Sequence, residues 1–536
     1  MADVAQETPL DNSITMKSDK TSITIGALIQ VFFTLISRVF GMIRDVMVSH
    51  IFGAGAVTDA FIAAFTIPNV LRQFFGEGAF SVAFVPIYVG VREKDGEHEA
   101  KRFFRHAFGL LAVSLMVVTA LGMLFSKSLI LLFAYGFSEN PEQLALANHM
   151  TRWLFPYVFM VSLVALFGAY LACFKRFAAM AFAPVLLNLT MIVFMVWGID
   201  AFRPPIMTLV ASVFVGGILQ VALMVFVLVR LNLWAPPALS FSTEPMKQLM
   251  RMLGPALFGV FVYQLNIIVL RQLASFLGEG QITYYYNADR LAQFATGVFA
   301  VSIATAALPE LSRGIARYGH GAFFDILRFT LTMSSFILTP CAAGLLAFAY
   351  PVITVIFVHG GGAFSAQDAL ITAHTLMAFS PSLIAFGWSR PLIQAFYAQG
   401  DTRTPVKVGV VTVIVNVVIG WCMLRYEVIG LALTLSISSF IQFLFLSWLF
   451  KRKNPEFCLD LFRPFFSHVV ASSLACVIGM FIGQYGQWHL GFTLINALIL
   501  CILSGSAALS YFCFAYLLKI PEARKFITNI RSRIFK

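Results

Sequence analysis

Seven arginines lie inside or at the ends of long apolar stretches of this 536-residue sequence. They are Arg38, Arg44, Arg72, Arg152, Arg271, Arg290 and Arg390. An arginine at mid-bilayer costs about 2.5–3.5 kcal/mol on insertion scales, so it persists where it faces water, a partner or a ligand. The guanidinium group stays protonated, and its planar fork binds two oxygens of a phosphate. These residues therefore indicate a cationic site for an anionic molecule, and a diphosphate is a suitable ligand.

The depth of three arginines follows from the rise of an α-helix. At about 1.5 Å per residue, Arg38 lies ~20 Å from the start of its apolar stretch at residue 24, and Arg72 lies as deep in its own. Arg290 lies near the start of a third stretch. An alternative is that the arginines pair with acids and only fix helix packing, since Arg38 and Asp45 share one helix face. The other acids available are Asp59, Glu77 and Asp289.

The elements that carry these arginines are membrane-spanning helices. Hydrophobic residues make up 59% of the chain, charged residues 12%, and the mean hydropathy is +0.85. Soluble domains contain about 25% charged residues. The apolar residues form runs of about 20, enough to cross ~30 Å of hydrocarbon as helix, and they lack the alternation of a membrane barrel. We predict an all-α polytopic membrane protein with about 14 transmembrane helices.

The expected spans are read from the apolar runs. They are residues 24–46, 57–91, 103–126, 150–173, 181–199, 206–229, 249–277, 284–312, 325–349, 368–398, 406–424, 428–450, 464–484 and 490–518. Pro68, Pro184 and Pro381 fall inside spans and should kink them. Gly41, Gly76 and Gly78 lie beside the arginines, and together with Pro68 they are candidate hinges.

The distribution of lysine and arginine sets the orientation. Most of the 37 basic residues fall in loops on one side, whereas Lys127, Arg203 and Arg425 lie on the other. Both termini are therefore expected to be cytoplasmic. The net charge of +12 follows from this bias and from attraction to anionic membrane lipids, so no nucleic-acid partner is required. Residues 1–22 are polar and are expected to be a disordered cytoplasmic tail.

A weak internal repeat suggests the domain organisation. Residues 52–61 (FGAGAVTDAF) match residues 277–286 (LGEGQITYYY) at an offset of 225, and Asn188 resembles Asn416 at nearly the same offset. An even number of spans per repeat gives a parallel pseudo-repeat. We expect two six-helix lobes, residues 23–230 and 249–450, joined by a cytoplasmic linker at 231–248. A loop at 451–463, two C-terminal helices in 464–518 and a basic cytoplasmic tail at 519–536 follow.

Several motifs of the first half resemble the MurJ (MviN) family of lipid II flippases, in the superfamily of MATE-like multidrug, oligosaccharidyl-lipid and polysaccharide exporters. The motifs are residues 37–45 (SRVFGMIRD), 52–55 (FGAG), 58–61 (TDAF), 68–72 (PNVLR) and 77–86 (EGAFSVAFVP). Shorter matches are residues 183–184 (AP), 254–256 (GPA), 288–290 (ADR), 308–312 (LPELS) and 401–405 (DTRTP). The resemblance extends over nearly the whole chain after residue 22.

The resemblance implies a bacterial cytoplasmic-membrane transporter for peptidoglycan biosynthesis, hence cell-wall biogenesis and cell shape. The implied substrate is lipid II, an undecaprenyl-diphosphate-linked peptidoglycan precursor, moved by alternating access between two lobes around a central cationic cavity. The last two helices would form a groove for the lipid tail. The family's cavity residues carry over to Arg38, Arg44, Asp59, Arg72 and Arg290, with Glu77 as a further candidate. The cell-wall synthesis machinery is an implied partner.

This chain departs from the family pattern in two places. Some members have a cavity lysine in the second span, where this chain has Thr66. The family includes members with a sodium-binding aspartate in the seventh span, where residues 266–271 of this chain read NIIVLR. We therefore expect no sodium coupling and no cofactor. The membrane potential is a sufficient drive, because a cationic empty site is pulled back toward a negative cytoplasm.

Other functions fit the residues less well. A multidrug exporter would favour acids and aromatic rings for cationic drugs, although a flippase or exporter for another lipid-linked oligosaccharide would share the arginines. An intramembrane enzyme has no support, since the chain lacks G-x-S-x-G, H-E-x-x-H and Walker A motifs, and residues 359–362 (HGGG) fit a loop turn. A structural scaffold would not explain arginines on three spans. We expect no catalytic residues and no metal site.

Overall fold

The secondary structure of the described chain is helical. The computed structural model describes residues 9–74, 79–240, 243–458 and 460–524. Ten stretches of these residues are long and apolar enough to cross a membrane, and one of them, Arg403–Lys453, contains two successive helices. The prediction of an all-α polytopic membrane protein is confirmed. The count of about fourteen spans stays a prediction.

By their packing, the described residues fall into two compact units. The first comprises the described parts of Met1–Met47, Ala64–Ile130 and Leu144–Phe261. The second comprises those of Val48–Ala63, Leu131–Gln143 and Val262–Lys536. Two segments of the N-terminal half therefore pack with the C-terminal half. The lobe boundaries drawn from sequence follow the repeat, not this packing, and stay a prediction.

The first unit contains most of the helices before residue 262. They are α1 (Pro9–Phe52), α2 (Ala56–Arg72), α3 (Ala79–Leu124), α4 (Ser126–Phe133), α5 (Pro141–Leu154), α6 (Pro156–Ala172), α7 (Ala178–Trp197), α8 (Met207–Arg230) and α9 (Glu244–Ala274). The ends of α1, α4 and α9 and the starts of α2 and α5 pack in the second unit. Short 3₁₀ turns lie at Tyr135–Glu139 and Ile199–Ala201.

Aromatic rings form the centre of the first unit, between α3 and α6. The rings of Phe104 and Tyr170 stack with centroids 3.8 Å apart, and Tyr88 meets Tyr170 edge-on at 5.2 Å. Trp234 joins this cluster by packing edge-on against Phe108. Such rings bury 150–250 Å² each, so they fix the scaffold on which α1 and α2 are held.

The second unit contains the remaining helices. They are α10 (Gln281–Ala295), α11 (Val301–Arg313), α12 (Gly319–Phe357), α13 (Ala366–Ala398), α14 (Arg403–Met423), α15 (Glu427–Lys453), α16 (Phe462–Gly483) and α17 (Leu494–Leu517). Two π-helical turns, Thr296–Ala300 and Gly314–Tyr318, flank α11, and 3₁₀ turns lie at Ser275–Leu277, Leu424–Tyr426 and Trp488–Leu490.

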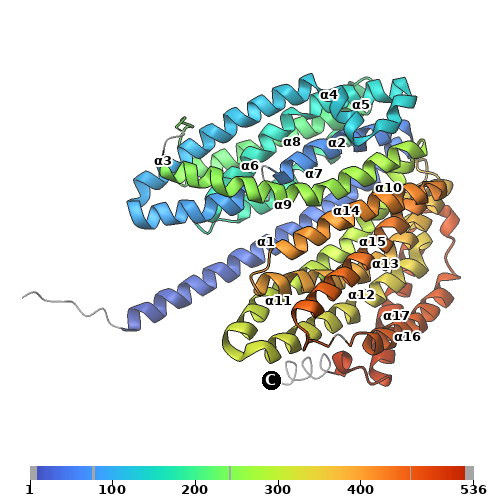
Figure 1. Ribbon diagram of the computed structural model, residues 1–536. Helices are drawn as coiled ribbons and strands as arrows, with labels where there is room; N and C mark the ends of the chain where they lie inside the picture. The colour runs from blue at the N-terminus through green and yellow to red at the C-terminus, as the bar shows by residue number, and fades with distance from the viewer. Residues whose placement is uncertain (1–8, 75–78, 241–242, 459, 525–536) are drawn as a thin grey trace, which may run out of the picture. The chain divides into compact units, whose positions relative to one another are not determined.

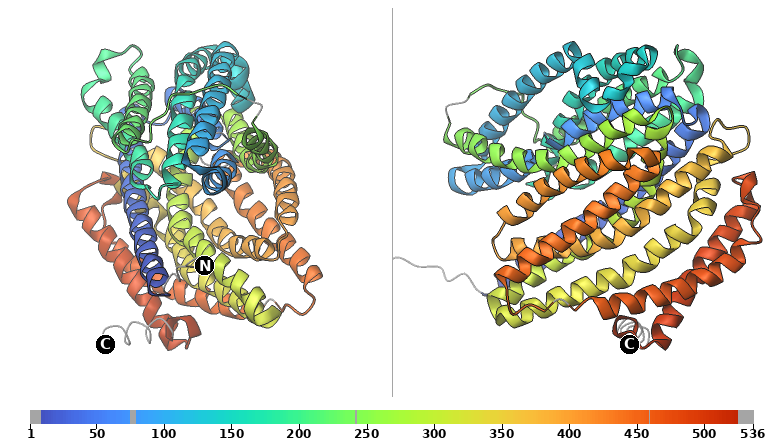
Figure 2. Two further views of the ribbon diagram at one scale, coloured as in Figure 1. Left: turned by 90° about the vertical axis from the view of Figure 1, so that its left-hand side faces the viewer. Right: turned by 45° about the vertical axis from the view of Figure 1, so that its right-hand side comes forward.

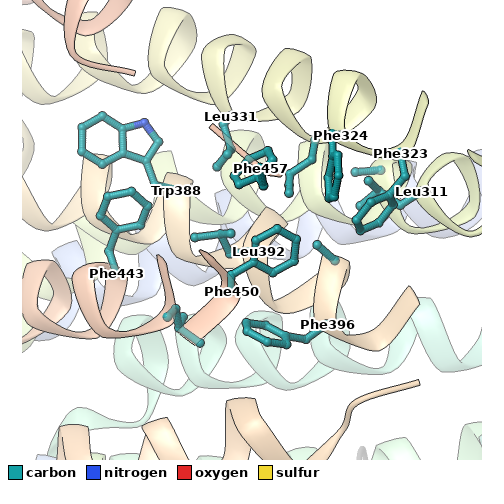
Figure 3. Close-up of a cluster of buried hydrophobic side chains, with 14 of the residues drawn as sticks. Leu311, Phe323, Phe324, Leu331, Trp388, Leu392, Phe396, Phe443, Phe450 and Phe457 are labelled. Carbon is teal, nitrogen blue, oxygen red and sulfur yellow. The ribbon is translucent and has the colours of Figure 1, made fainter. Parts of the chain in front are cut away.

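The core of the second unit lies between α11, α12, α13 and α15. Figure 3 shows Trp388 beside Phe443, with Phe450 and Phe457 next to Phe323 and Phe324. The Trp388 and Phe443 ring centroids are 5.0 Å apart. Apart from the indole N–H of Trp388, this cluster is apolar, and its burial stabilises the unit.

The last two helices, α16 and α17, form a pair that packs against α12 (Figures 1 and 2). The Tyr511 hydroxyl on α17 donates to the Phe336 carbonyl on α12 at 2.7 Å. Buried His468 on α16 lies 3.8 Å from the Glu522 carboxylate, beyond the end of α17. The chain after α17 is thereby tied back to α12 and α16.

One sequence prediction differs from the structure. The tail predicted as disordered over residues 1–22 is helical from Pro9 onward. α2 and the first part of α3 occupy the span predicted over 57–91, and the rest of α3 occupies the span predicted over 103–126. Gly96, with φ +88°, breaks α3 within its polar stretch.

Candidate functional site

Arg38 lies on α1 with its side chain half-buried. Among the residues that the structure describes, it has neither a hydrogen-bond partner nor an ion-pair partner. A half-buried guanidinium group that the protein does not neutralise is a strong site for an anionic ligand. The ion pair between Arg38 and Asp45, considered from sequence as an alternative, is absent from the described residues.

Arg44, six residues further along α1, is fully engaged by the protein. Its side chain is buried, and Nε and Nη2 donate to Asp45 Oδ1 at 3.0 and 2.7 Å. Its Nη1 donates to Asn188 Oδ1 on α7 at 2.9 Å, and Asn188 Nδ2 donates to the Ser37 carbonyl at 3.1 Å. Arg44 thus joins α1 to α7 with its charge balanced by Asp45.

Arg72 is the last residue of α2 and is half-buried. Pro68 is buried inside the same helix, and the Asn69 side chain donates to the Phe65 carbonyl at 2.9 Å. The α-helix gives way to a π-helical turn at Gln73–Phe74. Irregular turns of this kind are frequent at functional sites. Gly76, Glu77 and Gly78 lie outside the described residues.

Gly41 lies between the two arginines of α1, and the helix continues through it without interruption. A Cβ atom added to Gly41 would lie 3.5 Å from Asn188 Nδ2, which is an ordinary contact. Glycine is therefore not required there by space or by backbone conformation. The role of Gly41 as a hinge stays a prediction.

Asp59 in the first turn of α2 is completely buried and makes three hydrogen bonds within the second unit. Its Oδ1 accepts from the Thr283 backbone N–H at 2.8 Å and from the Thr283 hydroxyl at 2.6 Å. Its Oδ2 accepts from the Gly280 N–H at 2.7 Å. Because Gly280 and Thr283 begin α10, the carboxylate caps that helix and faces its positive dipole end.

Further bonds hold the same N-terminal segment in the second unit. Asn287 Nδ2 on α10 donates to Ser49 Oγ at 3.0 Å. The Ala363 N–H donates to the His50 carbonyl at 2.7 Å, beside a turn closed by Gly362 N–H and the His359 carbonyl. Residues 359–362 therefore form the predicted loop turn. We call the contacts of Ser49, His50 and Asp59 with α10 and this loop the latch.

Arg290 lies on α10 and is half-buried. Its Nε donates to the Tyr286 hydroxyl at 3.0 Å, and its Cζ lies 5.0 Å from the centroid of that ring. Arg271, at the end of α9, is buried against Tyr285 and Tyr286. Arg152 and Arg390, by contrast, have exposed side chains.

Two partners of these residues were not predicted as functional. Asn188 anchors Arg44, and Thr283 holds Asp59. A signal for both was present in the repeat, since Thr283 matches Thr58 and Asn188 matches Asn416. Asn416 on α14 likewise hydrogen-bonds Asn266 on α9, so each asparagine ties its helix to the first helix of its half. Gly53 and Gly278, another matched pair, both adopt positive φ, at +68° and +91°.

Comparison with solved structures places this helical fold among membrane transporters. An inward-facing MATE-family multidrug resistance transporter of the MOP superfamily matches with a TM-score of 0.65 at 13% identity, over 80% of this chain and 99% of that one. A lipid II flippase MurJ in an inward closed conformation matches with a TM-score of 0.75 at 24% identity, over 93% and 100%. The chain has the fold of this class of polytopic helical transporters.

Sequence comparison defines the family within that class. The family model described as lipid II flippase MurJ matches residues 48–499. A probable lipid II flippase MurJ of Buchnera aphidicola is 33% identical over 470 residues, 87% of this chain and 91% of the relative. The lipid II flippase MurJ of Burkholderia cenocepacia is 33% identical over 388 residues, 72% and 75% respectively. The chain belongs to the lipid II flippase MurJ family.

Proposed function

We propose that this chain translocates lipid II from the inner to the outer leaflet of the bacterial cytoplasmic membrane. The relatives' names supply the substrate class. The single observation that carries the proposal is Arg38, a half-buried cation on a membrane helix that the described protein leaves unneutralised. A diphosphate-linked lipid is the kind of ligand that balances such a charge.

The arginines divide into two roles in this proposal. Arg38, Arg72 and Arg290 bind the diphosphate through charge-assisted hydrogen bonds. Arg44 is a positioning residue, because Asp45 and Asn188 occupy its donors and fix the turn of α1 that carries Arg38. Glu77 stays a candidate for the same site. The chain acts as a carrier, so no bond of the substrate is broken.

We propose that the latch keeps the protein closed on one side of the membrane during part of the transport cycle. Opening on that side requires Asp59 to leave Gly280 and Thr283, and its carboxylate must then find water or a ligand. Hydrogen bonds to a charged group contribute about 1.5–3 kcal/mol each. Bonds of this strength can keep the latch closed, and the free energy of substrate binding can offset their loss.

The membrane potential is the proposed drive. With both termini in the cytoplasm, an empty site carrying several arginines is pulled inward by a potential that is negative inside. One charge crossing 100 mV is worth about 2.3 kcal/mol. The loaded site is nearly neutral, so the potential acts mainly on the return step. Neither sodium nor a cofactor takes part, and the cell-wall synthesis machinery supplies and consumes the lipid.

The test begins with binding of lipid II to the purified protein in competition with cardiolipin. Arg38→Ala, Arg72→Ala and Arg290→Ala should each weaken the preference for lipid II. Arg425→Ala is the matched control, since that exposed arginine lies over the ring of its neighbour Tyr426, at 4.7 Å to the centroid. Equal competition by cardiolipin, with no effect of the three substitutions, would overturn the proposal.

Transport itself is then measured in proteoliposomes. Wild type should move lipid II between leaflets, and collapse of an imposed inside-negative potential should slow turnover. Turnover that is independent of the potential would remove the proposed drive while leaving the substrate assignment intact. A second polyprenyl-diphosphate sugar, moved at the same rate, would show that the substrate class is broader than lipid II.

A further inference from the structure

Arg271 occupies the last turn of α9 and has a surrounding that is unusual for a buried charge. Its side chain is only 7% exposed. The guanidinium carbon lies 5.5 Å from the ring centroids of both Tyr285 and Tyr286 on α10. In the described part of the chain, its buried Nη1 has no hydrogen-bond partner.

The neighbouring acids do not supply the missing acceptors. Arg271 is within electrostatic reach of Asp59 and Asp289. The Asp59 oxygens already accept from Gly280 and Thr283, and Asp289 Oδ2 accepts from Gln293 at 2.6 Å. The tyrosine faces attract a cation but offer no lone pair to its N–H donors. Burying an arginine in this way costs free energy unless an anion accepts hydrogen bonds from its remaining N–H donors.

The Tyr286 ring contacts both Arg271 and Arg290, so a second guanidinium group lies near that of Arg271. Its ring lies 5.0 Å from Arg290 Cζ and 5.5 Å from Arg271 Cζ. Its hydroxyl accepts from Arg290 Nε. One aromatic side chain thus holds two arginines from two helices, α9 and α10. Asp59 and Asp289 offset the charge of the two arginines, but neither carboxylate accepts a hydrogen bond from Arg271 in the described part of the chain.

We propose that Arg271, Arg290 and Tyr286 form a phosphate-binding subsite, and that its ligand is the diphosphate of the transported lipid. The inference rests on the proposed function and adds Arg271 to the substrate-binding residues. Two guanidinium forks suit two phosphate groups. Tyr286, between the two arginines, lies in the second turn of α10, next to the first turn that holds Asp59 in the latch. A substrate reaching Arg271 is therefore one that has arrived beside the latch.

The experiment measures equilibrium binding of geranylgeranyl diphosphate and of lipid II to the full-length protein in detergent. Arg271→Met removes the charge and keeps an apolar stem of similar reach, and Arg271→Lys keeps only a point charge. Loss of one charge-assisted contact should weaken diphosphate binding about ten-fold or more for methionine, with lysine between methionine and wild type. Arg425→Met, the exposed arginine–tyrosine control, should bind like wild type.

Thermal unfolding without ligand separates binding from structure. Arg271→Met removes a counter-charge of the buried acids Asp59 and Asp289, so its midpoint should fall, whereas Arg271→Lys keeps that charge and should stay closer to wild type. Unchanged diphosphate affinity in Arg271→Met would overturn the inference, whatever its stability, and Arg271→Lys decides the question if the methionine variant does not fold. Cardiolipin is the competing source of phosphate, so loss of cardiolipin affinity with diphosphate affinity intact would also overturn it.

The two proposals fail in different ways. If wild type does not bind lipid II but binds geranylgeranyl diphosphate through Arg271, the proposed function fails and the subsite remains. If lipid II binds and depends on Arg38 and Arg72 but not on Arg271, the subsite fails and the proposed function remains.

Discussion

Asp59 and Thr283, more than two hundred residues apart in sequence, are joined by two hydrogen bonds to one carboxylate oxygen, at 2.8 Å from the backbone N–H and 2.6 Å from the hydroxyl. Both residues are essentially inaccessible to solvent. The pair ties the start of α2 to the start of α10, and it has no alternative partner in water while it is closed.

The Thr283 hydroxyl should therefore contribute measurably to stability. Thr283→Val keeps the shape and removes one hydrogen bond to a charged acceptor, so it should lower the free energy of unfolding by about 1.5–3 kcal/mol. Thr283→Ser keeps the hydroxyl and is the control. Thermal and chemical unfolding in one detergent measure both. A Thr283→Val variant as stable as wild type, with the loss confined to Thr283→Ser, would mean that the methyl packing, not the hydroxyl, matters.

Arg38 and Arg44 should respond to alanine substitution in opposite ways. Arg44→Ala leaves buried Asp45 without its counter-charge, which should cost about 3–5 kcal/mol of stability. Arg38→Ala removes no such contact, so stability should stay within about 0.5 kcal/mol while lipid II binding falls. Unfolding and binding are measured on the same preparations. A large stability loss in Arg38→Ala would show that Arg38 has a structural partner.

The sequence was sufficient for the helices whose ends are set by the length of an apolar run. The predicted spans 428–450 and 464–484 correspond to α15 (Glu427–Lys453) and α16 (Phe462–Gly483). It was insufficient for irregular turns inside a helix. The π-helical turn at Thr296–Ala300, within the continuous span Gln281–Arg317, depends on backbone bonds that hydrophobicity does not encode.

The candidate site, like the helices, could be predicted from the sequence only in part. Arginine in an apolar run is visible in sequence, because its cost is high whatever surrounds it. Which arginine is neutralised depends on a partner in another helix. Arg44 and Arg38 look alike in sequence, yet Asn188, far along the chain, binds only Arg44. The burial of Arg271 between two tyrosines was likewise set by the packing of α9 on α10.

Gly53 and Gly41 should tolerate alanine very differently. Gly53 has φ +68°, and an added Cβ would lie 2.7 Å from the Ala363 carbonyl oxygen, so Gly53→Ala should cost about 1–3 kcal/mol and loosen the latch. Gly41 is helical with room for a methyl group, so Gly41→Ala should raise stability by about 0.5–1 kcal/mol. Unfolding tests both substitutions. If Gly41 is a hinge, its alanine variant should also transport more slowly despite that gain.

Asp401 should give the protein a defined dependence of stability on acid pH. It lies between α13 and α14, outside the membrane spans. Burial by itself would raise its pKa, but the Thr404 N–H and hydroxyl and Lys453 Nζ all donate to the carboxylate, and together they hold the pKa below its usual value of 3.8. Its contribution is therefore present above that usual value and is lost as the pH falls through the lowered pKa of the folded state.

Asp401→Asn isolates this contribution, because asparagine cannot titrate. The wild-type midpoint of thermal unfolding should exceed that of the variant by a constant amount between about pH 5 and 7, and the difference should shrink below about pH 4. Lys453→Met, which removes one of the three donors, should move the loss to higher pH, closer to the usual value. A difference that is the same at every pH would mean that the carboxylate contributes through shape alone. A difference that grows on acidification would reverse the sign and show that the folded state favours the protonated acid.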